Sequence, residues 1–126
     1  MWEAYGLENE ELLWASTALR AGVAGNQSGT CGALSSAAVC LGLQHACPLD
    51  DKARAEEARE AAYDKARGIA DAFVEEFGAA ACIDLTGVDF SDEAARQKAR
   101  EEGMAEEKCH NYVKFVVGKL YDLEGE

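Results

Sequence analysis

The sequence predicts an all-α fold, a single compact bundle of four to five helices with a central buried helix. In four segments apolar residues recur every three or four positions, which is the period of an α-helix. Alanine dominates the 48 % of residues that are hydrophobic, and proline occurs once. No two segments have the pattern of paired strands. Because 126 residues suffice for one domain and are too few for two, we expect residues 1–126 to form a single helical domain.

The first predicted helix begins after Asn9, whose side chain can cap it, and continues to about Ala24. Gly22 and Gly25 favour a loose end to this helix. Its helical spacing predicts a buried stripe formed by Leu12, Ala15, Leu19 and Val23.

The central helix is predicted within the segment GNQSGTCGALSSAAVCLGL, residues 25–43. A polar loop comes first, and Thr30 is a good N-cap for a helix from Cys31 to about Gln44. This helix is apolar nearly all round, so we expect it to be the innermost one. The residues expected on one side of it are Leu34, Ala37, Ala38 and Leu41.

A long third helix is predicted from a cap at Asp50 or Asp51 to Phe77, with Gly78 ending it. Charged residues between its apolar positions indicate a solvated outer face. The apolar positions are Ala55, Ala58, Ala62, Ala66, Ile69, Phe73 and Phe77.

The segment 79–90 is apolar, and we expect a short helical turn there because no second strand exists to pair with it. Ser91 is predicted to cap a polar helix from Asp92 to Glu102, which Gly103 ends. The last helix is predicted from about Ala105 to Leu120. Its expected buried residues are Cys109, Tyr112, Val113, Val116, Val117 and Leu120.

The net charge of −12 argues against nucleic acid or an anionic membrane surface as a partner. No apolar run approaches the roughly 20 residues that span a bilayer, so we expect no membrane insertion. The start of the chain has no signal-peptide pattern, and we expect a cytoplasmic protein. Five widely spaced cysteines, an odd number, make a disulfide framework improbable and leave redox, metal or core roles.

Cys31 is the most distinctive of these cysteines. A thiol at a helix N-terminus faces unpaired N–H groups, which favour the thiolate, and the small residues around it would let another segment approach the sulfur. We therefore expect Cys31 to be the most reactive thiol, although a buried cysteine packed at a helix start has the same pattern. Cys40 lies mid-helix and is expected in the core. His110, next to Cys109, is expected at the surface.

Three cysteine neighbourhoods occur in one order, namely TCGALSSA, FVEEFGAAACIDLTGVD and EKCHNYV. In this the chain resembles the C-GCAxxG-C-C family of putative redox-active proteins, small helical proteins named for four cysteines. Cys31 lies in the CGA of the motif, and Cys82 and Cys109 resemble the third and fourth family cysteines. The motif's closing glycine is Ser36 here, and residues 1–11 contain no counterpart of the first cysteine.

The resemblance implies that Cys31, Cys82 and Cys109 converge, either as reversible catalytic thiols or as ligands of an iron–sulfur cluster or other metal. A closed metal site usually needs four ligands, so Cys40, Cys47, His110 or a partner subunit would have to supply the fourth. A dithiol pair needs only two cysteines. The implied partner is an unidentified redox partner, and a homo-oligomer is possible. The alternative is a non-enzymatic helical adaptor or oligomerisation module whose cysteines are structural.

Overall fold

The computed structural model describes residues 3 and 6–125, and in this part of the chain it contains helices and two isolated β-bridges. The predicted all-α fold is confirmed. The expected count of four to five helices is approximate, since the helical turn predicted within 79–90 forms a short helix of its own. The elements are α1 (Glu11–Ser16), the 3-10 turn η1 (Thr17–Leu19), α2 (Gly32–Gln44), α3 (Lys52–Phe77), α4 (Cys82–Thr86), α5 (Glu93–Glu101), the π-helical turn η2 (Ala105–Cys109) and α6 (His110–Glu124).

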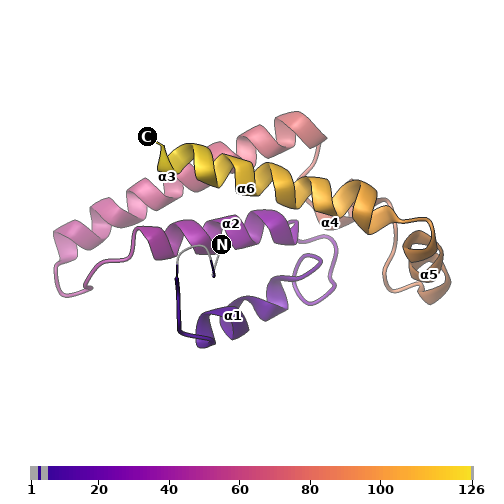
Figure 1. The fold of residues 1–126 in the computed structure, drawn as a ribbon, viewed down its shortest axis with the longest axis horizontal. Coiled ribbons are helices and arrows are strands. Elements are labelled where there is room, and N and C mark those ends of the chain that lie inside the picture. Colours follow the sequence, from indigo (N-terminus) through magenta and orange to yellow (C-terminus); the bar gives the residue numbers. More distant parts are fainter. Residues whose placement is uncertain (1–2, 4–5, 126) are drawn as a thin grey trace.

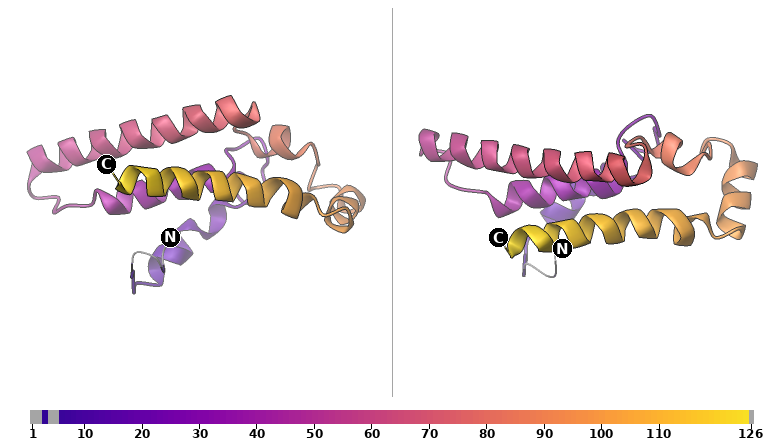
Figure 2. Two further views of the ribbon diagram at one scale, coloured as in Figure 1. Left: turned by 45° about the horizontal axis from the view of Figure 1, so that its top comes forward. Right: turned by 90° about the horizontal axis from the view of Figure 1, so that it is seen from above.

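The three long helices α2, α3 and α6 lie side by side, and α5 stands across one end of them (Figures 1 and 2). Leu41, Phe73 and Leu120, one from each long helix, are at most 2 % exposed. Next to them the Phe73 and Phe77 rings contact Tyr112 and Phe115 at centroid distances of 4.8 to 6.0 Å. This apolar and aromatic packing holds α6 against α3.

Helix α2 packs against α3, α6 and η1, which agrees with its predicted central position. Leu34, Ala37 and Leu41 are buried as predicted, and so is Cys40. Ala38 is exposed, contrary to expectation, and Val39 beside it is 37 % exposed. One side of the central helix is therefore open to solvent at these two residues.

The predicted first helix is wrong in length and in burial. Asn9 accepts a hydrogen bond from the Glu11 amide, as a capping residue does, but α1 ends at Ser16. The hydroxyls of Ser16 and Thr17 both donate to the Leu13 carbonyl at 3.0 Å, which competes with continued helix. The chain then turns, with Ala21 and Ala24 in the left-handed region.

None of the expected buried stripe of this first helix is buried. Helix α1 has no buried residue, and Val23 is 60 % exposed. Gly22, with φ at +79°, is required in the turn that follows, since a side chain there would collide with the Asn26 carbonyl.

The third helix is confirmed almost to the residue. The Asp51 carboxylate accepts from the Arg54 amide at 3.1 Å, and Gly78 ends the helix in the left-handed conformation. The short helix α4 confirms the predicted turn. In α5 the cap is Asp92 rather than Ser91, because the Ser91 hydroxyl donates to Asp89 at 2.6 Å.

The last helix is longer than predicted and reaches Glu124. Tyr112, Val116 and Leu120 are buried as expected, but Val113 is 50 % exposed. Cys109 is half-buried. Because the π-helical turn η2 directly precedes α6, Cys109 does not lie in the first turn of a helix, where backbone amides have no partner within the helix. His110 is exposed, as expected.

None of the helices in the described part of the chain combines the length and the apolarity that a membrane crossing needs. Residues 1, 2, 4, 5 and 126 of the expected single domain lie outside the described residues, and the division of the chain into one domain stays a prediction.

Candidate functional site

An antiparallel bridge between Thr30 and Ala81 joins the loop before α2 to the start of α4. The Cys31 amide donates to the Ala80 carbonyl at 2.7 Å, and the Cys82 amide donates to the Gly29 carbonyl at 3.1 Å. Each cysteine directly follows a bridged residue, and side chains alternate between the two faces of extended backbone. Cys31 and Cys82 therefore lie on the same face of the bridge.

Thr30 does not cap α2 as predicted. The structure places Cys31 at the N-cap position, and the helix begins one residue later than expected, at Gly32. The reason is the bridge, which holds Thr30 in extended backbone outside the helix. At Gly32 a side-chain carbon would make an ordinary van der Waals contact, 3.4 Å from the Leu19 carbonyl oxygen.

The Gln27 side chain binds α4 and the segment that follows it. Its side chain is 7 % exposed, and its amide nitrogen donates to the Val88 carbonyl at 2.7 Å while its oxygen accepts from the Phe90 amide at 2.6 Å. The same nitrogen lies 3.8 Å from the Cys82 sulfur and 3.4 Å from the Thr86 hydroxyl. A single buried amide thus fixes both α4 and the segment after it.

Two side chains from the C-terminal part of the chain attach it to α4. The Tyr112 hydroxyl donates to the Leu85 carbonyl at 3.0 Å, and the Lys108 ammonium donates to the Thr86 carbonyl at 3.2 Å. Cys109 lies between these two residues in the sequence. The same contacts therefore bring the Cys109 side chain toward the face that carries Cys31 and Cys82.

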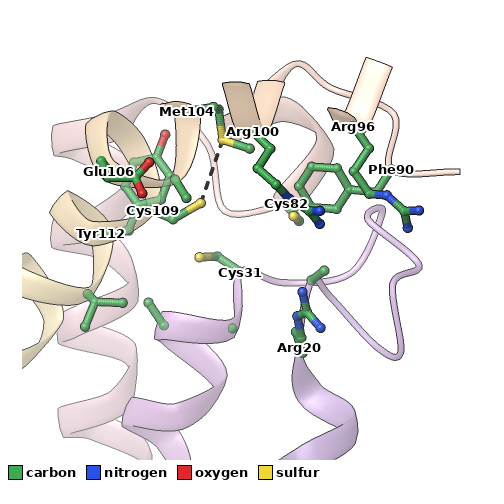
Figure 3. A pocket seen from close by; sticks show the side chains of 15 residues that line it. Arg20, Cys31, Cys82, Phe90, Arg96, Arg100, Met104, Glu106, Cys109 and Tyr112 are labelled. Carbon is green, nitrogen blue, oxygen red and sulfur yellow. Dashed lines mark hydrogen bonds between the residues drawn. The ribbon is translucent and has the colours of Figure 1, made fainter. Parts of the chain in front are cut away.

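The three cysteines line one cavity of about 370 Å³, which we call the thiol pocket. Figure 3 shows the three sulfurs directed toward the same space, Cys31 from below and Cys109 from η2. The Cys109 thiol lies 3.9 Å from the Met104 sulfur. The other lining residues are Arg20, Ala21, Gly32, Ala33, Phe90, Arg96, Arg100, Met104, Ala105, Glu106, Tyr112 and Val113.

The remaining two cysteines lie elsewhere. Cys40 is buried in the core on α2, and Cys47, in the loop after α2, lines a different pocket together with Leu49 and Ala55. All five cysteines belong to the described part of the chain, and none forms a disulfide. Cys31, Cys82 and Cys109 therefore meet at one cavity, whereas none of the three candidates for a fourth ligand from the same chain, Cys40, Cys47 and His110, is among its lining residues.

The thiol pocket has no preformed group of metal ligands among the described residues. Among residues 3 and 6–125, no three side chains of histidine, cysteine, aspartate or glutamate are grouped closely enough to hold a metal ion. Ligation of an iron–sulfur cluster or other metal by Cys31, Cys82 and Cys109 stays a prediction.

Burial governs the acidity of Cys31. Desolvation raises the pKa of its thiol, and the nearby Cys82 thiolate adds to the increase. The amides of Ala33 and Leu34, in the first turn of α2, lower the pKa by stabilising the thiolate, but their effect is smaller. The amides at the N-terminus of α2 favour the thiolate, as expected, but burial has the larger effect on the pKa of Cys31. The reactivity of Cys31 relative to Cys40 stays a prediction.

The pKa values of two further pocket residues, Cys109 and Tyr112, shift in the same direction. Burial raises the pKa of the Cys109 thiol, with further increases from the charges of Cys31 and then Cys82. Burial also raises the pKa of Tyr112, whose phenol is kept protonated and able to donate to the Leu85 carbonyl. Because charges on neighbouring cysteines raise the pKa of Cys31 and of Cys109, the sulfurs of the pocket lie close enough for a charge on one to affect another.

Sequence reasoning missed Gln27 and the arginines of the pocket. Gln27 lies in a polar loop, where side chains are usually solvated, so no signal marked it as buried. Arg96 and Arg100 were detectable, since residues four apart on a helix share one face. Arg20 was hidden because the predicted first helix extended past it.

Comparison with known proteins gives one family. The family model described as "Putative redox-active protein (C_GCAxxG_C_C)" matches residues 1–123. A search of curated proteins and a search of solved structures gave no match to this chain.

Proposed function

This chain belongs to the C_GCAxxG_C_C family of putative redox-active proteins, and we propose that it carries out reversible thiol–disulfide exchange in the thiol pocket. The observation that carries the proposal is the meeting of Cys31, Cys82 and Cys109 at one cavity, all as thiols. A dithiol reaction needs two of them, so the missing first family cysteine does not prevent it.

Cys31 is the attacking thiol in this proposal. It is half-buried and lines the pocket, and the amides of Ala33 and Leu34 stabilise its thiolate. Cys82 is only 7 % exposed and contacts the Gln27 amide, so an incoming disulfide reaches it less easily. Attack requires the thiolate, and these amides help to form it at Cys31.

Cys109 is the resolving thiol. Cys31 and Cys82 are diagonal neighbours across the bridge, where Cα atoms in a regular antiparallel pair lie about 7–8 Å apart. A disulfide usually needs a Cα separation of about 4.4–6.8 Å. The Cys109 thiol is also influenced more by the charge of Cys31 than by that of Cys82. Both features favour a bond between Cys31 and Cys109.

The proposed reaction consists of two thiol–disulfide exchange steps. The Cys31 thiolate attacks one sulfur of a substrate disulfide, a mixed disulfide forms, and the other substrate sulfur leaves as a thiolate that takes a proton from solvent. The Cys109 thiolate then attacks the Cys31 sulfur and releases the second substrate thiol. Two protein thiols are oxidised and one substrate disulfide is reduced. An external dithiol, the proposed redox partner, restores the reduced protein.

The first test counts thiols after oxidation. Native protein is treated with a small excess of diamide, which accepts two electrons and two protons from a thiol pair, and is then unfolded for the count. We expect the number of titratable thiols to fall from five to three and to return to five with dithiothreitol. Cys47→Ser, outside the pocket, should likewise lose two thiols. Cys31→Ser should keep all its thiols under the same treatment.

An unchanged thiol count in the wild-type protein contradicts the proposal and supports the structural adaptor instead. An equal loss in Cys31→Ser and Cys47→Ser contradicts the role of Cys31, because the oxidised pair would then not include it.

A further inference from the structure

Positive charge is concentrated at the thiol pocket of an acidic protein. The chain has a net charge of −12, yet half of its six arginines, Arg20, Arg96 and Arg100, line this single cavity. Arg20 follows η1, whereas Arg96 and Arg100 lie one turn apart on α5. Figure 3 shows Arg20 rising from one wall and the two α5 arginines descending from the opposite wall.

These guanidinium groups are largely unpaired within the protein. In the described part of the chain, no salt bridge involves Arg20 or Arg100, and Arg96 has only a long contact of 3.9 Å with the exposed Glu93. The carboxylate that lines the pocket, Glu106, lies with Cys109 on the side away from the arginines (Figure 3). The charge of the arginines is therefore available to a ligand.

The arginines do not act by ionising the attacking or resolving thiol. The groups that lower the pKa of Cys31 are the amides of Ala33 and Leu34, and the only cation that lowers the pKa of Cys109 is Lys108. A cationic cluster at the mouth of a reactive pocket that leaves these two thiols unaffected is suited to binding an anion.

The other lining residues and the volume of the pocket indicate the size and the apolar character of the ligand. Phe90, Met104 and Val113 provide apolar contacts beside the sulfurs, and about 370 Å³ lies within the range of small-molecule sites. Building on the proposed exchange reaction, we infer that the thiol pocket takes a low-molecular-weight disulfide that carries carboxylates. Its carboxylates pair with Arg20 and Arg100, and its sulfur–sulfur bond is presented to Cys31.

Two disulfide probes test this inference. Oxidised glutathione has a net negative charge from its carboxylates, and 2-hydroxyethyl disulfide is neutral. The second-order rate of thiol oxidation is measured with each probe. For Arg20→Gln and Arg100→Gln we expect a loss of about 10-fold with oxidised glutathione, because each variant loses a charge-assisted pair. The loss should be clearly smaller with the neutral disulfide, because that probe has no carboxylate to pair with either arginine.

The matched control is Arg67→Gln, an exposed arginine on α3 that makes the same change in net charge away from the pocket. It should leave both rates within about two-fold of wild type. Higher salt should slow the reaction with oxidised glutathione alone. Circular dichroism confirms that each variant is folded.

The outcomes separate the two proposals. If the wild-type protein reacts with neither disulfide, the exchange function is wrong and the ligand class with it. If it reacts with both, but Arg20→Gln and Arg100→Gln behave as Arg67→Gln does, the function stands and the anionic ligand is wrong.

Discussion

Replacing Cys31 with serine is expected to slow the reduction of 2-hydroxyethyl disulfide by roughly two orders of magnitude or more. The hydroxyl has nearly the shape of the thiol but does not attack a disulfide. The remaining pocket thiols are poor substitutes, since Cys82 is buried and the amides of Ala33 and Leu34 stabilise the thiolate of Cys31. The rate is measured by release of 2-mercaptoethanol under pseudo-first-order conditions.

The pH profile of the wild-type rate provides a second readout. Because burial raises the pKa of Cys31, the thiolate fraction continues to increase above the ordinary thiol pKa, and the rate should rise with it. Cys47→Ser should keep both the rate and the profile. A Cys31→Ser variant that retains the wild-type rate would remove Cys31 from the mechanism.

Replacing Gln27 with leucine is expected to lower the free energy of unfolding by about 2–4 kcal/mol. The side chain is of similar size and apolar, so the Val88 carbonyl and the Phe90 amide lose their hydrogen-bond partners. Each group left without a partner costs about 1–3 kcal/mol where it is buried. Urea denaturation measures the loss as a lower midpoint at an unchanged slope.

Gln97→Leu is the matched control, since Gln97 is exposed on α5 and bonds only to the exposed Glu101. Its effect should stay within about 0.5 kcal/mol. Gln27→Leu should also speed the alkylation of Cys82 in the native protein, because α4 is then held less firmly. Equal midpoints for the two leucine variants would show that the Gln27 contacts do not stabilise the fold.

The sequence predicts helices most accurately where local signals agree. Asp51, the spacing of apolar residues and Gly78 all indicate the same bounds for α3, and the structure has them. The first helix was overestimated because its apolar spacing continues past Ser16, whereas the hydroxyls of Ser16 and Thr17 and the turn at Gly22 end it. The spacing of apolar residues does not reveal such competition between side-chain and backbone hydrogen bonds.

The sequence predicted only part of the candidate site. The family motif pointed to Cys31, Cys82 and Cys109, which the fold brings to one pocket. The bridge between Thr30 and Ala81 that aligns two of them joins segments 51 residues apart, each too short to have a strand pattern. The acidity of Cys31 was also not predictable, because burial depends on segments that pack over it from elsewhere in the chain.

We expect two cysteines of the thiol pocket to form a reversible disulfide. Peptide mapping of diamide-treated native protein, alkylated before digestion, tests it most directly by identifying the linked residues. We predict one intramolecular disulfide between Cys31 and Cys109, absent after dithiothreitol, with Cys40 and Cys47 recovered as alkylated thiols. Recovery of both Cys31 and Cys109 as alkylated thiols after diamide treatment would contradict the account.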